Sequence, residues 1–319
     1  MTDVVTTGSG EPSDWEDLSP AEAAEKYGLK QMGVRPPLVD YVRSLWARRS
    51  FIAVLARARS ESENQGTYLG QLWNILNPVM NATVYVLIFG VLLDTQRGMD
   101  NVVGFIVVGT FMYRFFSDSV TVSAKSIPKN MSLVRSLHFP RAVLPVSSVL
   151  SELATLAPAM GVMAGFVWVS DRFMAHTDGT PSWRWLLIVP AIVLLYVFST
   201  GVGLVLARWG ARSPDILNTL PFVLRLGMYA SGVIFSIDHY VQSGTLSAIM
   251  SDQQIETLSA IMNYQPVAVY LNLSRQAMLV ETSYPLDGTY WILGAAWALA
   301  AFVIGFLHFW RGEARYGRD

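Results

Sequence analysis

The chain has 319 residues, of which 52% are hydrophobic and only 15% are charged, whereas soluble domains usually carry about 25% charged residues. Its formal net charge is −1, so the composition gives no basic character suited to nucleic acid, and we expect no nucleic-acid partner. There are no cysteines, which excludes disulfides, zinc–thiolate sites and thiol nucleophiles.

The N-terminal part contains two segments of different character. Residues 1–36 are polar and acidic and lack the apolar core of a signal peptide, so we expect a disordered cytosolic tail. Residues 37–66 are basic, and Leu38, Val42 and Leu45 recur there at helical spacing. This pattern predicts a basic amphipathic helix that lies in the membrane interface, although an ordinary surface helix would share it.

Six apolar stretches follow, and each is long enough to cross a bilayer, which takes about 20 mostly apolar residues. They are Ile75–Leu93, Val102–Val120, Val143–Val169, Trp185–Ala207, Leu217–Phe235 and Tyr290–Phe309. We therefore expect an all-α integral membrane protein with six transmembrane helices in residues 67–311, followed by a basic cytosolic tail at residues 312–319. Pro266–Leu279 is apolar but too short to span, which predicts re-entrant half-helices before the last span.

Positive charges are concentrated in alternate connections between these stretches. The N-terminal region, the connection between the second and third stretches, and the C-terminal tail are rich in Arg and Lys. The other long connections are mostly acidic. The positive-inside rule then predicts that both termini are cytosolic, which agrees with an even number of spans.

The sequence carries no nucleotide-binding loop of its own. A GxxxxGK[ST] loop needs a lysine after glycine, and the lysines are Lys26, Lys30, Lys125 and Lys129, none of which fits. The four histidines are far apart and form no metal-binding pattern. We expect no catalytic residue, no cofactor and no metal on this chain, so the energy for any active process must come from elsewhere.

Ionisable residues interrupt three of the apolar stretches. Arg114 and Asp118 are four residues apart on the second stretch, hence on one helix face. Glu152 is on the third stretch and Arg225 is on the fifth. Buried charges are costly in a membrane and usually face a cavity or each other. Two interpretations remain open: a polar entrance in which Arg114 or Arg225 meets an anionic headgroup, or a charge-balanced structural cluster.

Aromatic residues are frequent near these charges, and their faces suit the apolar faces of sugar rings. Candidate contacts along a substrate path are Trp73, Tyr85, Tyr113, Phe115, Phe116 and Tyr229. Aromatic residues in membrane helices also serve as interface anchors or as packing, and the sequence alone leaves that alternative open.

Several sequence segments together resemble the permeases of polysaccharide-export ABC transporters, the type 2 exporter class. These segments are Tyr68–Pro78 (YLGQLWNILNP), Phe111–Ser117 (FMYRFFS), Asn130–Val134 (NMSLV), Phe139–Pro145 (FPRAVLP) and Asn263–Arg275, which begins NYQP. The resemblance covers roughly residues 37–311. One departure is that the family's Asn-Pro pair is here separated by Tyr264 and Gln265.

The resemblance implies a homodimeric permease with a separate ATPase subunit, present in two copies, that holds ATP and Mg. It implies export of a lipid-linked glycan, such as O-antigen, teichoic acid or cell-wall galactan, across the cytoplasmic (inner) membrane. The chain as a whole is most similar to the mycobacterial-type galactan exporter permeases. Arg114 and Arg225, with the aromatic residues named above, are then the expected substrate path.

The basic connection after the second stretch is the expected ATPase contact, and it should carry a short coupling helix. The residues concerned are Asn130, Leu133, Val134, Arg135, Phe139, Pro140 and Arg141. Two alternatives to a permease are a membrane enzyme of lipid-linked glycan synthesis and an ion-coupled secondary carrier. The first would need a metal-ready acidic loop and the second would be favoured by inverted repeats, and we find neither in the sequence.

Overall fold

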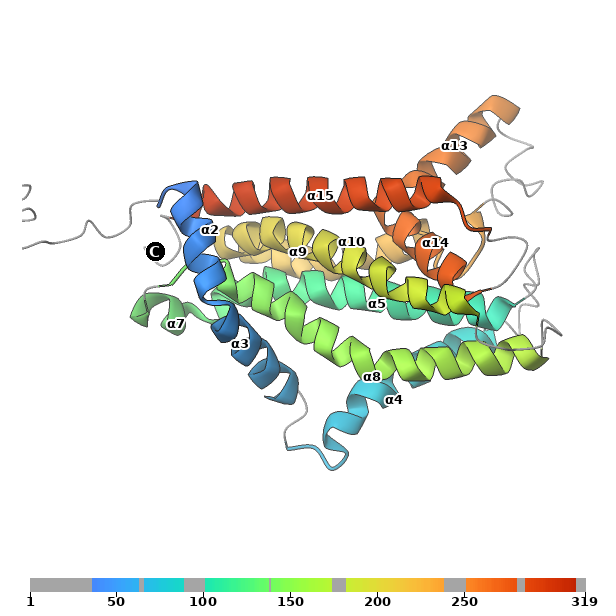
Figure 1. Cartoon of the computed structure of the whole chain (residues 1–319), viewed down its shortest axis with the longest axis horizontal. Coiled ribbons are helices and arrows are strands. Elements are labelled where there is room, and N and C mark those ends of the chain that lie inside the picture. The colour runs from blue at the N-terminus through green and yellow to red at the C-terminus, as the bar shows by residue number, and fades with distance from the viewer. Residues whose placement is uncertain are drawn as a thin grey trace, which may run out of the picture.

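The computed structural model describes residues 36–62, 66–88, 101–137, 139–173, 182–237, 251–279 and 285–313, without the side chains of residues 71, 85 and 173. Within these ranges the chain is helical, with connecting turns and no strand. The long helices lie side by side, and short helices gather at both ends of the bundle (Figure 1). The predicted tails at residues 1–36 and 312–319 lie outside the described residues except for residues 36, 312 and 313.

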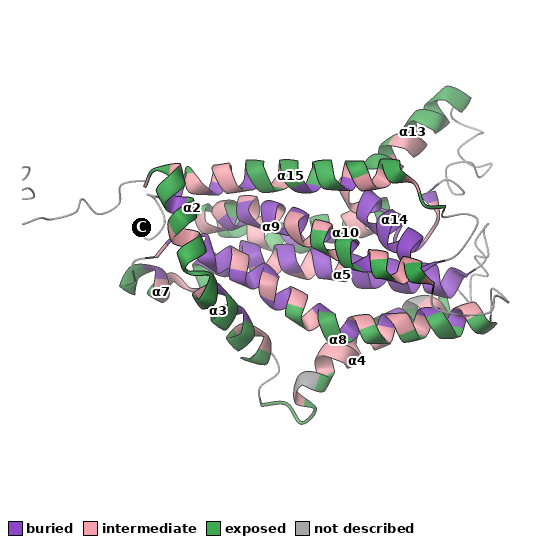
Figure 2. Cartoon of the chain, viewed as in Figure 1, coloured by how far each residue is buried: buried purple, intermediate pink, exposed green. Residues whose placement is uncertain are grey.

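Among the described residues, four helices are long and apolar enough to cross a membrane, and they match the second, third, fourth and sixth predicted spans. They are α5 (Val102–Ala124), α8 (Val143–Phe173), α9 (Ile188–Arg212), preceded by the 3-10 turn η3 (Trp183–Leu187), and α15 (Gly288–Trp310). The helix α5 lies at the centre and is buried along most of its length, whereas α15 exposes one side (Figure 2).

Helices α9 and α15 form the closest pair in the bundle. A Cβ added to Gly201 would overlap the backbone of Ala301, and one added to Gly305 would overlap the backbone of Gly201. Glycine is therefore required at both positions, since small residues let membrane helices approach closely.

The first and fifth predicted spans differ from the expectation. The helix α4 (Trp73–Tyr85) follows the 3-10 turn η1 (Gly70–Leu72), and the predicted continuation to Leu93 lies largely outside the described residues. The fifth span was predicted as Leu217–Phe235, but α10 runs from Pro214 to Ala230. Its 17 residues rise only about 25 Å, which is less than the roughly 30 Å of a hydrocarbon core.

A buried arginine explains why α10 ends early. Gly232 has φ +66°, a left-handed conformation that glycine adopts without a steric penalty. The Arg275 guanidinium donates hydrogen bonds to the carbonyls of Gly232 (2.9 Å) and Val233 (3.1 Å) and lies against the ring of Phe105. Because these contacts hold the chain away from the helix axis, the apolar run 233–235 does not extend the helix.

The predicted interfacial helix at residues 37–66 is two helices, so the expectation of a single helix was wrong. They are α2 (Leu38–Ala47) and α3 (Arg49–Ser62). The break falls at Arg48, whose φ and ψ of −95° and 16° end the first helix. The second helix packs on α8, where Arg59 donates to Ser148 and the hydroxyls of Ser60 and Thr155 lie 3.3 Å apart.

The remaining short helices lie at the ends of the bundle (Figure 1). Near α2 are α6 (Ser126–Lys129) and α7 (Met131–Ser136), and at the opposite end are α13 (Asp252–Tyr264) and α14 (Pro266–Met278). The helix α14 is buried from Ala268 to Met278 and packs on α5, α9 and α15. This agrees with a half-helix sheltered by protein, while its re-entrant placement in a membrane stays a prediction.

Candidate functional site

A polar stripe runs along α5, although this helix is the most buried of the four long helices in the described part of the chain. Thr110, Arg114, Ser117, Asp118 and Thr121 recur three or four residues apart and therefore share one face. The Arg114 Nε donates to Asp118 Oδ2 at 3.2 Å, with side chains that are 36% and 46% exposed. The shared helix face predicted for these two residues is confirmed, and the structure adds that they form an ion pair.

A first cavity lies on the side of α5 that faces α8, and we call it the α8-side cavity. It has a volume of about 170 Å³. Its lining comprises Trp73, Asn74, Asn77, Pro78, Phe111, Arg114, Phe115, Asp118, Glu152, Thr155, Leu156 and Ala159. Formally, one arginine here faces two carboxylates, of which Glu152 is buried. In the described parts of the chain, no group of three or more His, Asp or Glu could hold a metal ion.

A second, larger cavity lies on the side of α5 that faces α10, and we call it the α10-side cavity. Its volume is about 360 Å³, which falls in the range of small-molecule sites. Its lining comprises Asn81, Thr110, Tyr113, Arg114, Ser117, Asp118, Thr121, Pro221, Leu224, Arg225 and Met228. Here two arginines face one carboxylate, so the formal charge favours an anion, in contrast to the α8-side cavity.

The structure thus brings all four predicted intramembrane charges to the surroundings of α5. Arg114 and Asp118 line both cavities, Glu152 lines the smaller one and Arg225 lines the larger one. The helix α10 is fixed to α5 by a hydrogen bond from the Tyr113 hydroxyl to the Leu224 carbonyl.

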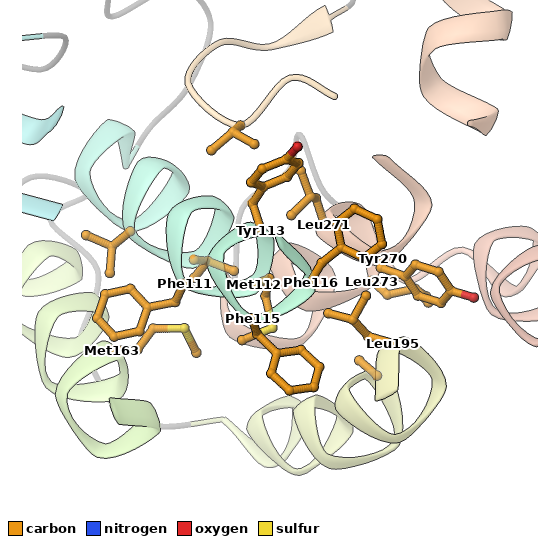
Figure 3. Packing of buried hydrophobic residues seen from close by; sticks show 14 of the residues in the cluster. Phe111, Met112, Tyr113, Phe115, Phe116, Met163, Leu195, Tyr270, Leu271 and Leu273 are labelled. Atoms are coloured by element: carbon orange, nitrogen blue, oxygen red, sulfur yellow. The ribbon is translucent and has the colours of Figure 1, made fainter. Parts of the chain in front are cut away.

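The predicted aromatic path residues occupy several environments. Phe115 lines the α8-side cavity and Tyr113 the α10-side cavity, and the two leave α5 on opposite sides (Figure 3). Phe116 packs in the core, with its ring centroid 5.7 Å from that of Phe198. Trp73 begins α4 and lines the α8-side cavity, and Tyr229 is exposed on α10. The side chain of residue 85 lies outside the described part.

The predicted coupling segment contains the short helix α7, as expected. Val134 is buried in it, Arg135 is exposed, and the Asn130 side chain donates to the Ser126 carbonyl at 2.7 Å. Phe139 packs edge-on against Phe51 of α3, with ring centroids 5.9 Å apart. Leu133 is half-buried and Pro140 is buried. The segment is therefore anchored to the bundle on one side and exposed on the other.

Arg141 ends this segment in a junction of three chain regions. The Glu313 carboxylate accepts from the Arg141 backbone N–H and from the Tyr41 hydroxyl, both at 2.9 Å, and the Arg141 guanidinium donates to the Glu313 carbonyl. The Tyr41 hydroxyl also accepts from the Ala142 N–H at 3.1 Å. Burial raises the pKa of the Glu313 carboxyl above its ordinary value, while these hydrogen bonds oppose the rise.

Several lining residues were missed by the sequence reasoning. They are the amides of Asn74, Asn77 and Asn81 on α4 and the hydroxyls of Thr110, Ser117, Thr121 and Thr155 on α5 and α8. Their spacing, three and four residues on α4 and seven and four residues on α5, indicates a shared helix face, and this polar pattern could have been recognised in the sequence.

Comparison with known proteins identifies the kind of scaffold that carries these cavities. The sequence profile of the ABC-2 type transporter family matches residues 50–250. The chain is 25% identical over 200 residues to the O-antigen export system permease protein RfbA of Myxococcus xanthus, a match that covers 63% of this chain and 74% of that protein.

Two further relatives come from other bacteria. An O-antigen export system permease protein RfbA of Klebsiella pneumoniae is 26% identical over 175 residues, which cover 54% of this chain and 64% of that protein. The polysialic acid transport protein KpsM of Escherichia coli is 24% identical over 215 residues, which cover 66% of this chain and 74% of that protein.

Proposed function

The chain belongs to the ABC-2 type transporter family, and on that premise we propose that it is the permease subunit of an ATP-driven exporter of a lipid-linked polysaccharide. The observation that carries this proposal is the match to relatives named for O-antigen export and polysialic acid transport. The substrate would be a glycan of the O-antigen, teichoic acid or cell-wall galactan class. The protein is a multi-pass protein of the inner membrane, and we propose that both termini are cytosolic.

The substrate path in this proposal follows the polar face of α5 between α4 and α10. Two features support it: a stripe of polar side chains on a membrane helix, and two cavities that share Arg114 and Asp118. Polar groups inside a membrane protein usually face a cavity that conducts or binds a polar ligand. Arg114 and Arg225 would receive the phosphate groups of the lipid carrier, because guanidinium groups form bidentate hydrogen bonds with phosphate.

The complete transporter would contain two copies of this chain and two copies of an ATPase subunit. In this assembly the exposed apolar side chains of α10, among them Phe222 (70% exposed) and Leu226 (61%), would face lipid or the second copy. The exposed side of α7 and the rest of the Asn130–Arg141 segment would contact the ATPase. ATP and Mg would be bound by that partner.

Co-expression with the candidate ATPase subunits tests the assembly. The tagged permease should co-purify with one ATPase in a two-plus-two complex, measured by light scattering, and a lipid-linked glycan should stimulate its ATP hydrolysis. Charge reversal at Arg135, which is exposed on α7, should release the ATPase. A matched reversal at Arg184, a basic residue outside the proposed contact, should not. A permease without an ATPase partner would refute the proposal.

A further inference from the structure

We propose that the α10-side cavity is a sugar-binding subsite, in which the hydroxyls of Thr110, Ser117 and Thr121 bind the glycan next to the arginines that bind its phosphate. This inference rests on the proposed export function and names how the permease recognises the sugar part of its substrate. The three hydroxyl side chains line the same cavity and lie on the same face of α5.

The side chains of Thr110, Ser117 and Thr121 form a row along the helix axis, which we call the hydroxyl ladder. They lie seven and four residues apart with Arg114 between them, and eleven residues of α-helix rise roughly 16 Å. Asn81 of α4 lines the same cavity and adds an amide. Hydroxyl and amide groups both donate and accept hydrogen bonds, as sugar hydroxyls do, so a row of them suits a short stretch of glycan.

The hydroxyl of Thr110 gives independent support. Serine and threonine in helices often bond to the carbonyl four residues earlier, as Thr200 does to Tyr196 at 2.8 Å. The side chain of Thr110 is buried, at 7% exposure, and its hydroxyl has no hydrogen-bond partner among the described residues. A buried polar group without a partner is unfavourable, and rotation of this side chain toward the cavity would let a ligand hydroxyl relieve that cost.

Two other buried hydroxyls on α5 also lack a partner in the described part of the chain, but unlike Thr110 they do not line a cavity. Ser119 and Ser123 also lack a partner within the described ranges, but they lie on the opposite face of the helix and line neither cavity. Ser123 packs against α9, where it fills the space beside Gly203. These two serines therefore serve as matched controls on the same helix.

The rest of the lining is mostly apolar, with positive charge beside it. Pro221, Leu224 and Met228 form an apolar wall from α10, which suits the C–H side of a sugar ring. Arg225 and Arg114 supply positive charge at the same cavity. Small-molecule sites typically combine such an apolar wall with a few polar groups that fix the orientation of the ligand.

The test uses the purified complex of permease and ATPase in nanodiscs. Two probes are compared: a polyprenyl pyrophosphate, and the same lipid carrying a galactose tetrasaccharide. The measured quantity is the lipid concentration that gives half-maximal stimulation of ATP hydrolysis. The wild type should respond to the sugar-bearing lipid at a lower concentration than to the bare lipid, because only the former reaches the hydroxyl ladder.

The combined variant Thr110→Val, Ser117→Ala, Thr121→Val should lose that preference. Each lost hydrogen bond should raise the half-maximal concentration of the sugar-bearing lipid roughly 2- to 10-fold, with no change for the bare lipid. The control variant Ser119→Ala, Ser123→Ala should keep the wild-type preference. Arg225→Gln should raise the half-maximal concentration of both lipids alike, since both carry the pyrophosphate.

The outcomes separate the subsite from the export function on which it rests. If neither lipid stimulates the wild type, the proposed function fails. If both stimulate it but the ladder variant keeps the sugar preference, or the wild type has none, the subsite is overturned. Should the combined variant not fold, Ser117→Ala and Thr121→Val are each measured alone, because these side chains are partly exposed and tolerate substitution better.

Discussion

Arg114 is the residue on which the two interpretations of the charged cluster differ. Its ion pair with Asp118 leaves part of the guanidinium exposed, and that part lines both cavities. A purely structural role would leave the exposed part of the arginine unexplained. Contact with a phosphate would explain it, because hydrogen bonds to charged groups contribute about 1.5–3 kcal/mol.

Replacing Arg114 by lysine should separate these roles. Lysine keeps the charge beside Asp118 but cannot form the bidentate hydrogen bonds of a guanidinium group. We expect lipid-stimulated ATP hydrolysis and export to need roughly 10- to 100-fold more lipid-linked glycan, while thermal stability stays within about 1 kcal/mol. The measurements are export in proteoliposomes and thermal unfolding of the same preparation.

A double variant tests the alternative that Arg114 only balances the charge of Asp118. If the arginine only balances Asp118, then Arg114→Ala should impair export and the added change Asp118→Asn should restore it, because no orphaned charge remains. Restoration of export by the double variant would contradict a phosphate-binding role. We expect no restoration.

Residues that are neighbours on one helix could be placed relative to each other from the sequence, whereas residues on different helices could not. The shared helix face of Arg114 and Asp118 follows from helical spacing, so the sequence predicted it correctly, whereas their ion pair is seen only in the structure. The partition of Glu152 and Arg225 between two cavities depends on how α8 and α10 pack against α5, which no local pattern encodes. The core position of Phe116 has the same cause.

At the scale of elements, the junction around Glu313 joins α2, the end of the coupling segment and the end of α15. Burial raises the pKa of its carboxyl above the ordinary value of 4.5, with Tyr41 and Arg141 as the facing groups that oppose the rise. A carboxyl whose pKa is raised on folding stabilises the folded state below its unfolded pKa. That contribution is lost as the pH rises through the folded pKa.

The Glu313→Gln variant should reveal this dependence. Because glutamine does not titrate, the unfolding temperature of the wild type should fall relative to that of the variant as the pH is raised from about 4.5 to 8. Trp310→Phe is the control, since it removes a hydrogen bond to the Pro36 carbonyl at 3.0 Å and some packing but no titratable group, and it should shift the unfolding temperature equally at every pH. The opposite trend for Glu313→Gln would mean that the hydrogen bonds outweigh burial.

Element boundaries show where the sequence was informative. The ends of α8 and α15 lie within a few residues of the prediction, because polar residues bound their apolar runs. The end of α10 was missed, since the residues after Gly232 are as apolar as the helix and only the distant Arg275 turns the chain. The break at Arg48 between α2 and α3 likewise falls within a continuous helical pattern.

At the scale of the whole molecule, the all-helical membrane class and the family were predicted from composition and motifs. The six-span count was not confirmed in full, because the described residues contain four helices of spanning length. The cavities could not be predicted, since they arise from the packing of three separate helices. The orientation stays a prediction, and it decides whether α7 can meet a cytosolic ATPase.

Single cysteines can decide the orientation, because the chain has none of its own. Ser136 of α7 and Thr257 of α13 are both exposed and lie at opposite ends of the bundle (Figure 1). By the positive-inside rule, a membrane-impermeant maleimide added to intact spheroplasts should label Thr257→Cys and spare Ser136→Cys. Permeabilised cells are the control, and there both should react. The reverse pattern would place α7 outside the cell, where no ATP is available, and would remove it as the ATPase contact.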